Sequence, residues 1–429
     1  MASLIFLTSS FDLFLIIKAG GNFRLCQLVV PILLILALIR VARGTEVPTL
    51  GASSLCVWLA VQVLFIPASN FWPKSFGYCL WLLLNLAMMF SFVQLFGNNS
   101  RTLATILRLY ILSFGVIAVF GMVQFASPIL GFGAPLVTQW WVQDRLPRVN
   151  GFSYEPSYFA TYLLVGFVFV GSLRRGKSSL LPPRALLVIY CLTAIGIIIS
   201  SSRMGIVFVF LDVLLSQIRP WLWLCRDLAH GRIAWTTVRA LLPSSLFIGL
   251  VVFIGVWSVR LLDSSPAVAL MFLNGTGISD AAAHSVVQRE DALNDTLIVF
   301  RQHPLIGESL GGVSSGIAAL HGETIKSFEA SKNFEGMNVF AEALAASGII
   351  GIIPFLCFLF ATIHRPLKLA ANATPFYATL LRALLRSLVF GWAILQFNQN
   401  MLRPYLWVHI ALLAAVYAAA RESTSQTRS

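Results

Sequence analysis

The chain has 429 residues, of which 58% are hydrophobic and only 11% are charged, and its formal net charge is +13. Soluble domains carry about 25% charged residues, so this composition excludes a water-soluble globular protein. A hydrocarbon core about 30 Å thick needs about 20 apolar residues per helix, and this length accommodates many such spans. The apolar runs are continuous rather than alternating, which favours helices over a closed barrel.

Apolar runs taken in chain order predict an all-α, polytopic membrane bundle of about twelve transmembrane helices. The first run has no charged segment before it and no A-x-A-like cleavage site after it, so we interpret it as a retained span; a signal peptide is the alternative. The predicted spans are 4–17, 25–42, 49–67, 76–96, 103–125, 156–173, 183–200, 204–218, 240–261, 338–363, 376–396 and 403–420.

Lysine and arginine gather in alternate short loops, which sets the predicted orientation. The loop between the sixth and seventh spans is the richest, with Arg174, Arg175, Lys177 and Arg184, whereas the loops of the opposite face hold few basic residues. Both termini are therefore predicted to be cytoplasmic. The excess positive charge indicates topology and contact with anionic membrane lipids. No basic patch with interleaved aromatics stands outside the membrane, so nucleic-acid binding is not expected.

Two outside segments divide the chain. Residues 1–261 hold the first nine spans and an outside loop at about 126–155, residues 262–337 form a large outside loop, and residues 338–429 hold the last three spans and a cytoplasmic tail. The large loop carries nine of the chain's seventeen acidic residues. A loop of this length in a compact bundle is usually functional. The absence of an internal repeat argues against a transporter built from inverted repeats.

Within the large loop, the pattern predicts an amphipathic helix over 285–302. Ser285 suits an N-cap, and His303-Pro304 ends the helix. Arg289 shares one stripe with Leu293 and Phe300, at the helical repeat of 3.6 residues per turn. It is therefore expected to point toward the protein or the membrane surface, where a guanidinium requires an anionic partner.

The segment before the sixth span carries candidate chemistry. Arg148 precedes Asn150 and Gly151, and Glu155-Pro156 opens the span. The functional interpretation is an anion-binding arginine and a carboxylate base at the membrane surface. The structural alternative is that Glu155 caps a helix and Arg148 pairs with lipid phosphate, since Pro suits the first helical turn and acids suit a helix N-terminus.

Three other positions carry the same two interpretations. Arg203, in a polar hairpin between apolar spans, recognises diphosphate or snorkels to the interface. Asn338 opens the tenth span, in which Glu342 lies about one turn inside the membrane, where an acid is a functional hypothesis or a snorkelled structural group. His321, like His284, is an outside histidine that contacts substrate or is simply solvated.

Four motif segments occur in order over about residues 100–400, each beside an outside loop. They are Arg148-x-Asn-Gly-Phe followed by Glu155-Pro-Ser-Tyr-Phe-Ala; Ser201-Ser-Arg203-x-Gly; Arg289 at the head of a helix leading to His303-Pro-Leu-Ile-Gly307; and Asn338 followed by Gly348-Ile-Ile-Gly351. Together they resemble the O-antigen ligase and polymerase superfamily, which includes exopolysaccharide polymerases.

The resemblance implies a C-type glycosyltransferase-like architecture in the bacterial inner membrane, with the large loop in the periplasm and without metal, cofactor or nucleotide sugar. It implies a polymerase that joins undecaprenyl-diphosphate-linked repeat units in O-antigen or exopolysaccharide synthesis, beside a flippase and a chain-length regulator. Ligase-like members have histidine where this chain has Met337. That departure disfavours the alternative of a ligase that transfers finished glycan to lipid A-core.

These residues suggest a mechanism without a metal ion. Arg203 and Arg289 are expected to neutralise the leaving diphosphate, with Arg289 counted as catalytic, and Arg148 to position it. Glu155 is the first candidate for the base, followed by His321 and His284. Asn338 and His321 are expected to contact substrate. A glycolipid transporter or flippase is the alternative from another class, and it calls for ionisable groups near the bilayer midplane, of which only Asp212 and Asp12 stand out.

Overall fold

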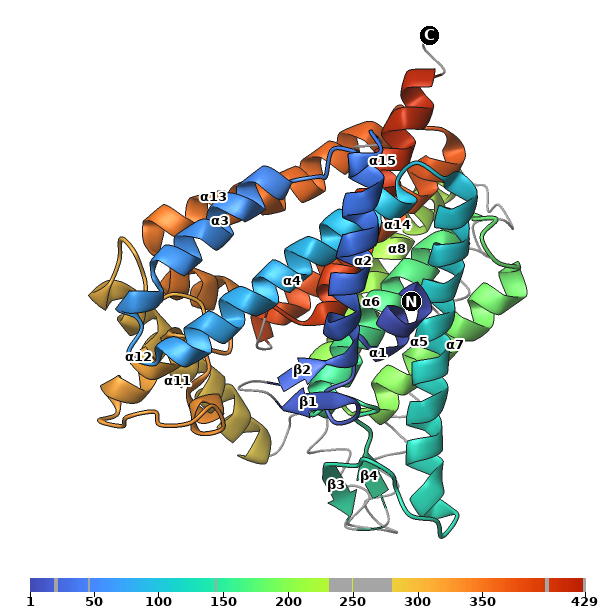
Figure 1. Ribbon diagram of the computed structural model, residues 1–429. Coiled ribbons are helices and arrows are strands. Elements are labelled where there is room, and N and C mark those ends of the chain that lie inside the picture. Colours follow the sequence, from blue (N-terminus) through green and yellow to red (C-terminus); the bar gives the residue numbers. More distant parts are fainter. Residues whose placement is uncertain are drawn as a thin grey trace.

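The computed structural model describes residues 1–18, 22–44, 47–142, 144, 146–230, 249, 280–397 and 401–426. These residues form a helix bundle with two short antiparallel hairpins, β1–β2 and β3–β4, at one end (Figure 1). Eight of the described helices are long and apolar enough to cross a membrane, and two shorter apolar helices accompany them. The predicted class, a helical multi-pass membrane bundle, is confirmed.

The elements follow the chain in this order. They are α1 (Ala2–Thr8), β1 (Ile16–Lys18), β2 (Asn22–Arg24), α2 (Leu25–Ala42), α3 (Ala52–Leu64), η1 (Ile66–Ala68), α4 (Trp72–Phe96), α5 (Ser100–Ile129), β3 (Gln139–Val142), β4 (Leu146–Arg148), α6 (Pro156–Arg175), α7 (Pro183–Ile199), α8 (Arg203–Ala229), α11 (Asp280–Gln302), α12 (Val313–Leu320), η2 (Ala330–Phe334), α13 (Val339–Ala370), α14 (Pro375–Ile394), η3 (Leu395–Phe397) and α15 (Pro404–Gln426).

The predicted first span, 4–17, is wrong as a helix. α1 ends at Thr8, and residues 16–18 pair with 22–24 as a hairpin. A helix of seven residues is only about 10 Å long, too short to cross a bilayer. The chain turns because the backbone N–H groups of Asp12 and Leu13 donate to Phe152 O at 2.9 and 3.1 Å, a long-range contact that the hydropathy pattern does not contain. The predicted span 240–261 lies outside the described residues.

The two termini lie at different depths of the bundle. In Figure 1 the N-terminus lies partway along α5, whereas the C-terminus extends beyond the end of the bundle opposite the hairpins. α1 packs against α2 and α5 through the buried side chains of Ile5 and Phe6. The structure therefore does not place the two termini together, as a twelve-span topology requires.

Helices α6, α14 and α15 form the centre of the bundle, and α2 lies at its edge with most of its surface exposed. Side-chain hydrogen bonds tie the central helices together. Ser387 Oγ donates to Val165 O at 2.6 Å, and the His409 ring bonds both Tyr110 Oη at 3.0 Å and Leu384 O at 2.9 Å. Buried polar groups that are satisfied in this way fix one helix register.

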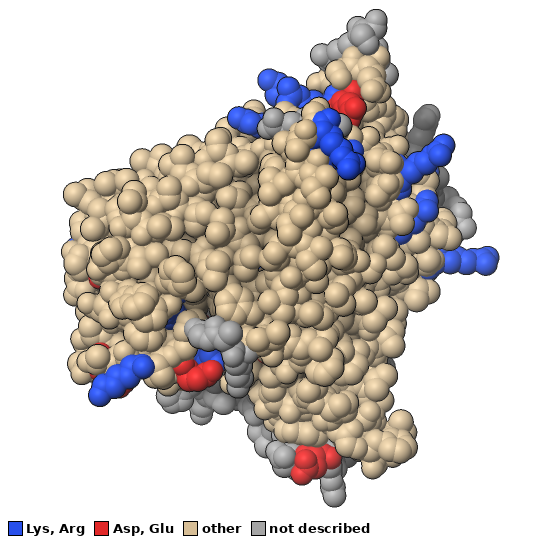
Figure 2. Space-filling view, viewed as in Figure 1, with Lys and Arg blue, Asp and Glu red and all other residues tan. Residues whose placement is uncertain are grey.

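Charged side chains lie mainly at the two ends of the bundle. Figure 2 shows Lys and Arg gathered at the end nearest the C-terminus and a broad band without charge between the ends of the visible face. An uncharged band of this kind is what a helix bundle presents to the hydrocarbon core of a bilayer.

The described part of the large loop, 280–337, is partly helical, as predicted. α11 ends at Gln302, where the sequence places the stop. Its most buried side chains are Thr296 and Val299, rather than the predicted Leu293 and Leu297, which are only half-buried. The inward face is rotated because α12 approaches closely: a Cβ on Gly316 would lie 2.9 Å from a methyl carbon of Val299.

The segment after α11 docks into a break in α13. At Gly348 the backbone adopts φ 57° and ψ −169°, which interrupts the helix. Beyond the break, the N–H groups of Ile349 and Ile350 donate to Pro304 O and Leu305 O at 2.9 and 3.2 Å. Two of the four motif segments, 303–307 and 348–351, are therefore halves of one packing interface.

We predict that Gly348→Ala destabilises the protein by about 3 kcal/mol, because the residue needs a positive φ and a Cβ there would lie 2.3 Å from Leu305 O. Thermal unfolding of the purified protein in detergent measures the effect. Gly131→Ala is the matched control, since Gly131 also has positive φ but a Cβ there meets nothing within 4 Å. Equal melting temperatures for the two variants would contradict the interface.

Candidate functional site

A cavity of about 690 Å³ opens among the hairpin end of the bundle and the described part of the large loop. Its walls come from the α1–β1 turn, α4, the start of α6, α11, α12 and the segment before α13. Small-molecule sites usually occupy about 300–1,000 Å³. The cavity is therefore the natural place to look for a substrate site.

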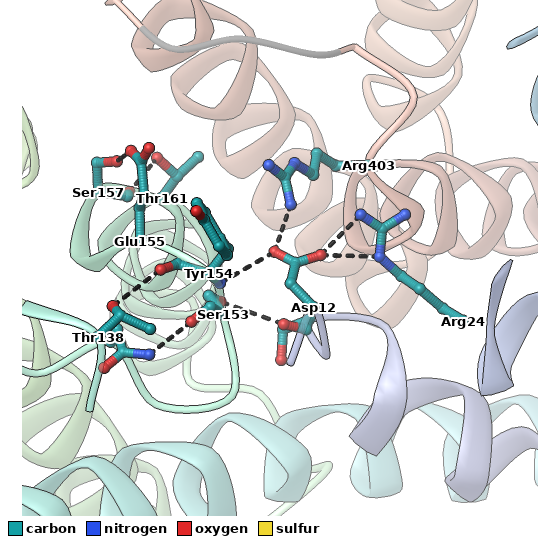
Figure 3. A network of polar contacts seen from close by, with 11 residues as sticks. Asp12, Arg24, Thr138, Ser153, Tyr154, Glu155, Ser157, Thr161 and Arg403 are labelled. Carbon is teal, nitrogen blue, oxygen red and sulfur yellow. Dashed lines mark hydrogen bonds and ion pairs between the residues drawn. The ribbon is translucent and has the colours of Figure 1, made fainter. Parts of the chain in front are cut away.

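One acidic residue joins two arginines at the base of the cavity (Figure 3). Arg24 bonds Asp12 Oδ1 through Nε at 2.8 Å and Nη2 at 2.7 Å, and Arg403 Nη1 pairs with Asp12 Oδ2. The side chains of all three are at most 10% exposed. We call this set the floor triad. Its two guanidiniums and one carboxylate leave a net charge of about +1.

Aromatic rings enclose the floor triad. The guanidinium carbon of Arg403 lies 3.7 Å from the ring centre of Tyr158, and that of Arg24 lies 5.8 Å from the ring centre of Trp81. Cations within about 6 Å of an aromatic face are attracted to it. Burial by itself raises the pKa of Asp12, but the charges of Arg403 and Arg24 outweigh it, so the pKa lies below its ordinary value.

Glu155 stands at the N-cap of α6 and lines the cavity. Its side chain makes no capping hydrogen bond; instead Oε2 accepts from Ser157 Oγ at 3.0 Å (Figure 3). The structural alternative of a capping glutamate is therefore not what the structure shows. The carboxylate is half-buried and sits where the start of α6 meets the cavity.

Arg148, Arg203 and Arg289 are close enough to Glu155 and to one another for their charges to interact. Burial lowers the pKa of Arg148, Glu155 opposes this effect, and the charges of Arg203 and Arg289 add to it. Burial and then Arg203 lower the pKa of Arg289, which Glu155 raises. We call the three residues the arginine cluster. The structure thus brings together three arginines from β4, α8 and α11 around one carboxylate.

The members of the arginine cluster differ in their contacts. Arg148 Nη1 donates to Gln139 Oε1 across the β3–β4 hairpin at 2.8 Å. Arg203 is the first residue of α8, and Arg289 lies on α11; both side chains are half-buried. Among the described residues, neither Arg203 nor Arg289 makes a hydrogen bond or a short ion pair. None of the three lines the cavity, so the cluster adjoins the cavity at Glu155 rather than inside it.

The remaining predicted site residues lie elsewhere. His321 lines the cavity, and its Nε2 lies 2.9 Å from Asp295 Oδ2. Asn338 does not line the cavity: its Oδ1 caps α13 by accepting from Phe340 N and Ala341 N, and its Nδ2 donates to Gln396 O. The side chain of His284 is outside the described part of the chain.

Sequence reasoning missed several residues of the cavity. Arg24 and Arg403 were read only as sparse charges of the outside loops, and the buried Lys74, which pairs with Glu335 at 3.0 Å, was read in the same way. A charge on the face that should carry few charges is the signal that could have marked them.

Comparison of the chain with protein-family models finds no match, and comparison with curated proteins finds no relative. The chemistry of the arginine cluster and of the cavity therefore has to carry the functional argument.

We predict that Asp12→Asn lowers stability by about 3 kcal/mol, because it leaves two buried guanidiniums without their counter-charge. Since the folded pKa of Asp12 is depressed, its contribution is fully present above the ordinary value of about 3.9 and is lost as pH falls through the folded pKa. Unfolding in detergent at neutral and acidic pH measures both effects.

Two further variants sharpen this test. Asp291→Asn removes an exposed carboxylate of the cavity rim and is expected to leave stability unchanged. Adding Arg24→Gln to Asp12→Asn removes one of the two stranded cations and is expected to recover part of the loss. If Asp12→Asn unfolds like Asp291→Asn at neutral pH, the floor triad does not stabilise the fold.

Proposed function

We propose that the protein is a membrane glycosyltransferase that polymerises undecaprenyl-diphosphate-linked repeat units at the periplasmic face of the bacterial inner membrane. The single observation that carries this proposal is the position of Glu155, which lines a cavity on one side and interacts with three arginines on the other. The proposal includes about twelve spans, a C-type glycosyltransferase-like architecture and cytoplasmic termini.

The arginine cluster suits a diphosphate. Three positive charges repel one another, and within the described residues Glu155 is the acid whose charge acts on both Arg148 and Arg289. Partly buried guanidiniums in this arrangement favour an anion between them, and their planar donors match phosphate oxygens two at a time. Arg203 also begins α8, so the positive end of that helix adds to the field.

The chemistry follows from this placement. A sugar hydroxyl of the acceptor attacks the anomeric carbon of the donor, and the bond from that carbon to the phosphate oxygen breaks. The leaving diphosphate gains negative charge, which the arginine cluster stabilises. Glu155 accepts the proton of the attacking hydroxyl from the cavity side.

A polymerase is favoured over a ligase by the residue at position 337. Met337 lines the cavity where ligase-like proteins have histidine, and a thioether cannot accept a proton as a base does. A chain-length regulator and a flippase are the partners that polymerisation of lipid-linked repeats calls for. Single repeats that accumulate in a deletion strain indicate a polymerase, whereas unattached full-length polymer indicates a ligase.

A glycolipid transporter is disfavoured by the pairing of the acids in the bundle. Asp212 on α8 is fully buried, and its carboxylate bonds Arg386 Nε at 2.7 Å and Arg175 Nη2 at 3.4 Å. Asp12 is likewise held by two arginines. An acid held by two cations acts as a clasp between helices rather than as an exchanging proton or ion site.

We predict that Arg203→Ala and Arg289→Ala each reduce polymerisation about 100-fold or more, because they remove charge compensation from the transition state. Lysine at either position is expected to restore little, since it lacks the planar fork of donors. The measurement is the length of the glycan ladder made from purified lipid-linked repeats in detergent, with EDTA present.

Arg301→Ala is the matched control for Arg289→Ala. Arg301 lies on the same helix, is exposed and lies outside the arginine cluster, so its loss is expected to leave the ladder unchanged. Wild-type activity of Arg289→Lys, or abolition of activity by EDTA, would refute charge compensation by arginine.

We predict that Glu155→Gln reduces the rate about 100-fold, since the amide keeps the acceptor for Ser157 Oγ but cannot take up a proton. Glu290→Gln, an exposed glutamate one residue from Arg289, serves as the control. The rate of ladder formation at equal amounts of folded protein measures both. A wild-type rate for Glu155→Gln would exclude Glu155 as the base and leave the His321–Asp295 pair as the next candidate.

A further inference from the structure

The cavity carries the opposite charge to the arginine cluster beside it. Among the described residues, its lining includes six acids against two arginines, one lysine and one histidine. The acids are Asp12, Glu155, Asp291, Asp295, Glu323 and Glu335. A diphosphate and the contents of this cavity therefore meet very different electrostatic surroundings, although Glu155 borders both.

The bases of the cavity are already engaged. Arg24 and Arg403 bind Asp12, and Lys332 Nζ pairs with Glu329 at 2.7 Å, a residue outside the lining. Some acids are engaged too, since Glu335 binds Lys74 and Asp295 binds His321.

Two acids of the rim are left to face the cavity. Asp291 and Glu323 are exposed, and neither makes a hydrogen bond or an ion pair with the described part of the chain. The charges left available to a ligand are therefore mainly negative.

The opposite wall is aromatic. The rings of Tyr78 and Trp81 stack with centres 5.1 Å apart, and Phe328 meets Trp81 edge-on at 6.3 Å. Trp81 is 5% exposed and lines the cavity, and within the described residues its indole N–H has no hydrogen-bond partner. A buried donor of this kind normally finds a partner, so this one points to a ligand acceptor.

An aromatic wall facing carboxylates matches the two sides of a sugar ring. The C–H face of a pyranose packs on an aromatic ring, and its hydroxyls donate to carboxylates, which are acceptors only. A volume of about 690 Å³ suits a short oligosaccharide rather than one sugar. A carboxylate on the sugar would instead face Asp291 and Glu323, and like charges in a partly desolvated site repel strongly.

We propose that this cavity is the acceptor-glycan subsite and that it selects neutral or amino sugars over acidic ones, while the arginine cluster holds the diphosphate. The inference rests on the proposed function, because it takes the occupant of the cavity to be a glycan. It adds the class of sugar, which follows from the charge of Asp291 and Glu323 and from the aromatic wall.

Binding of three soluble tetrasaccharides to the purified full chain in detergent tests this inference. The probes are chitotetraose, which is neutral, the glucosamine tetramer, which is cationic below its amine pKa, and the galacturonate tetramer, which is anionic. Isothermal titration at low salt is expected to give saturable binding of the first two and at least about tenfold weaker binding of the third. Trp81→Phe, which removes the indole donor, is expected to weaken binding of chitotetraose several-fold.

A charge-reversed variant locates the selectivity. Asp291→Lys combined with Glu323→Lys is expected to bring the galacturonate tetramer to an affinity equal to or above that of chitotetraose. Glu290→Lys, which adds the same charge on an exposed position of α11 outside the lining, is expected to leave the order unchanged.

Equal or tighter binding of the galacturonate tetramer to the wild type, or no saturable binding of any probe, overturns the inference. The same follows if Glu290→Lys changes the order as much as the double variant does. These measurements need no donor and no turnover. An inactive protein that still binds chitotetraose selectively would therefore count against the polymerase and not against the subsite, whereas an active polymerase that prefers galacturonate would count against the subsite alone.

Discussion

The geometry of the site depends on one buried carboxylate that holds two guanidiniums. Asp12 joins the turn after α1, the end of β2 and the residue before α15 through its ion pairs with Arg24 and Arg403. Backbone bonds from Asp12 and Leu13 to Phe152 then fasten the loop that precedes Glu155. Unpaired charges are too costly to bury, so these segments can meet only in the arrangement that satisfies all three groups.

Around this floor the protein separates two kinds of charge. The arginine cluster lies on one side of Glu155, and a cavity with acidic and aromatic walls lies on the other. A reaction between a phosphorylated donor and a hydroxyl acceptor needs this division, because the leaving group is anionic and the nucleophile must lose a proton. One carboxylate at the boundary can serve the acceptor without lying among the phosphate ligands.

The four motif segments contain scaffold as well as chemistry. Asn150 is fully buried, and the N–H groups of Asn150 and Gly151 both donate to Gln124 Oε1, at 3.2 and 2.9 Å. A Cβ on Gly205 would lie 3.0 Å from Ala160, so glycine there permits α8 to approach α6. Asn338 caps a helix, and Gly348 receives the segment after α11. Within these segments the arginines and Glu155 remain available for chemistry.

Hydropathy and charge by themselves determined the membrane class, most of the long helices, the end of α11 and the candidates Arg148, Glu155, Arg203 and Arg289. These features depend on local composition or helical period, which the sequence states directly. The sequence could not reveal that 4–17 fails to span, that Arg24 and Arg403 converge on Asp12, or that a loop fills the break at Gly348. Those features join residues tens to hundreds of positions apart, and only the tertiary structure decides which buried polar groups meet.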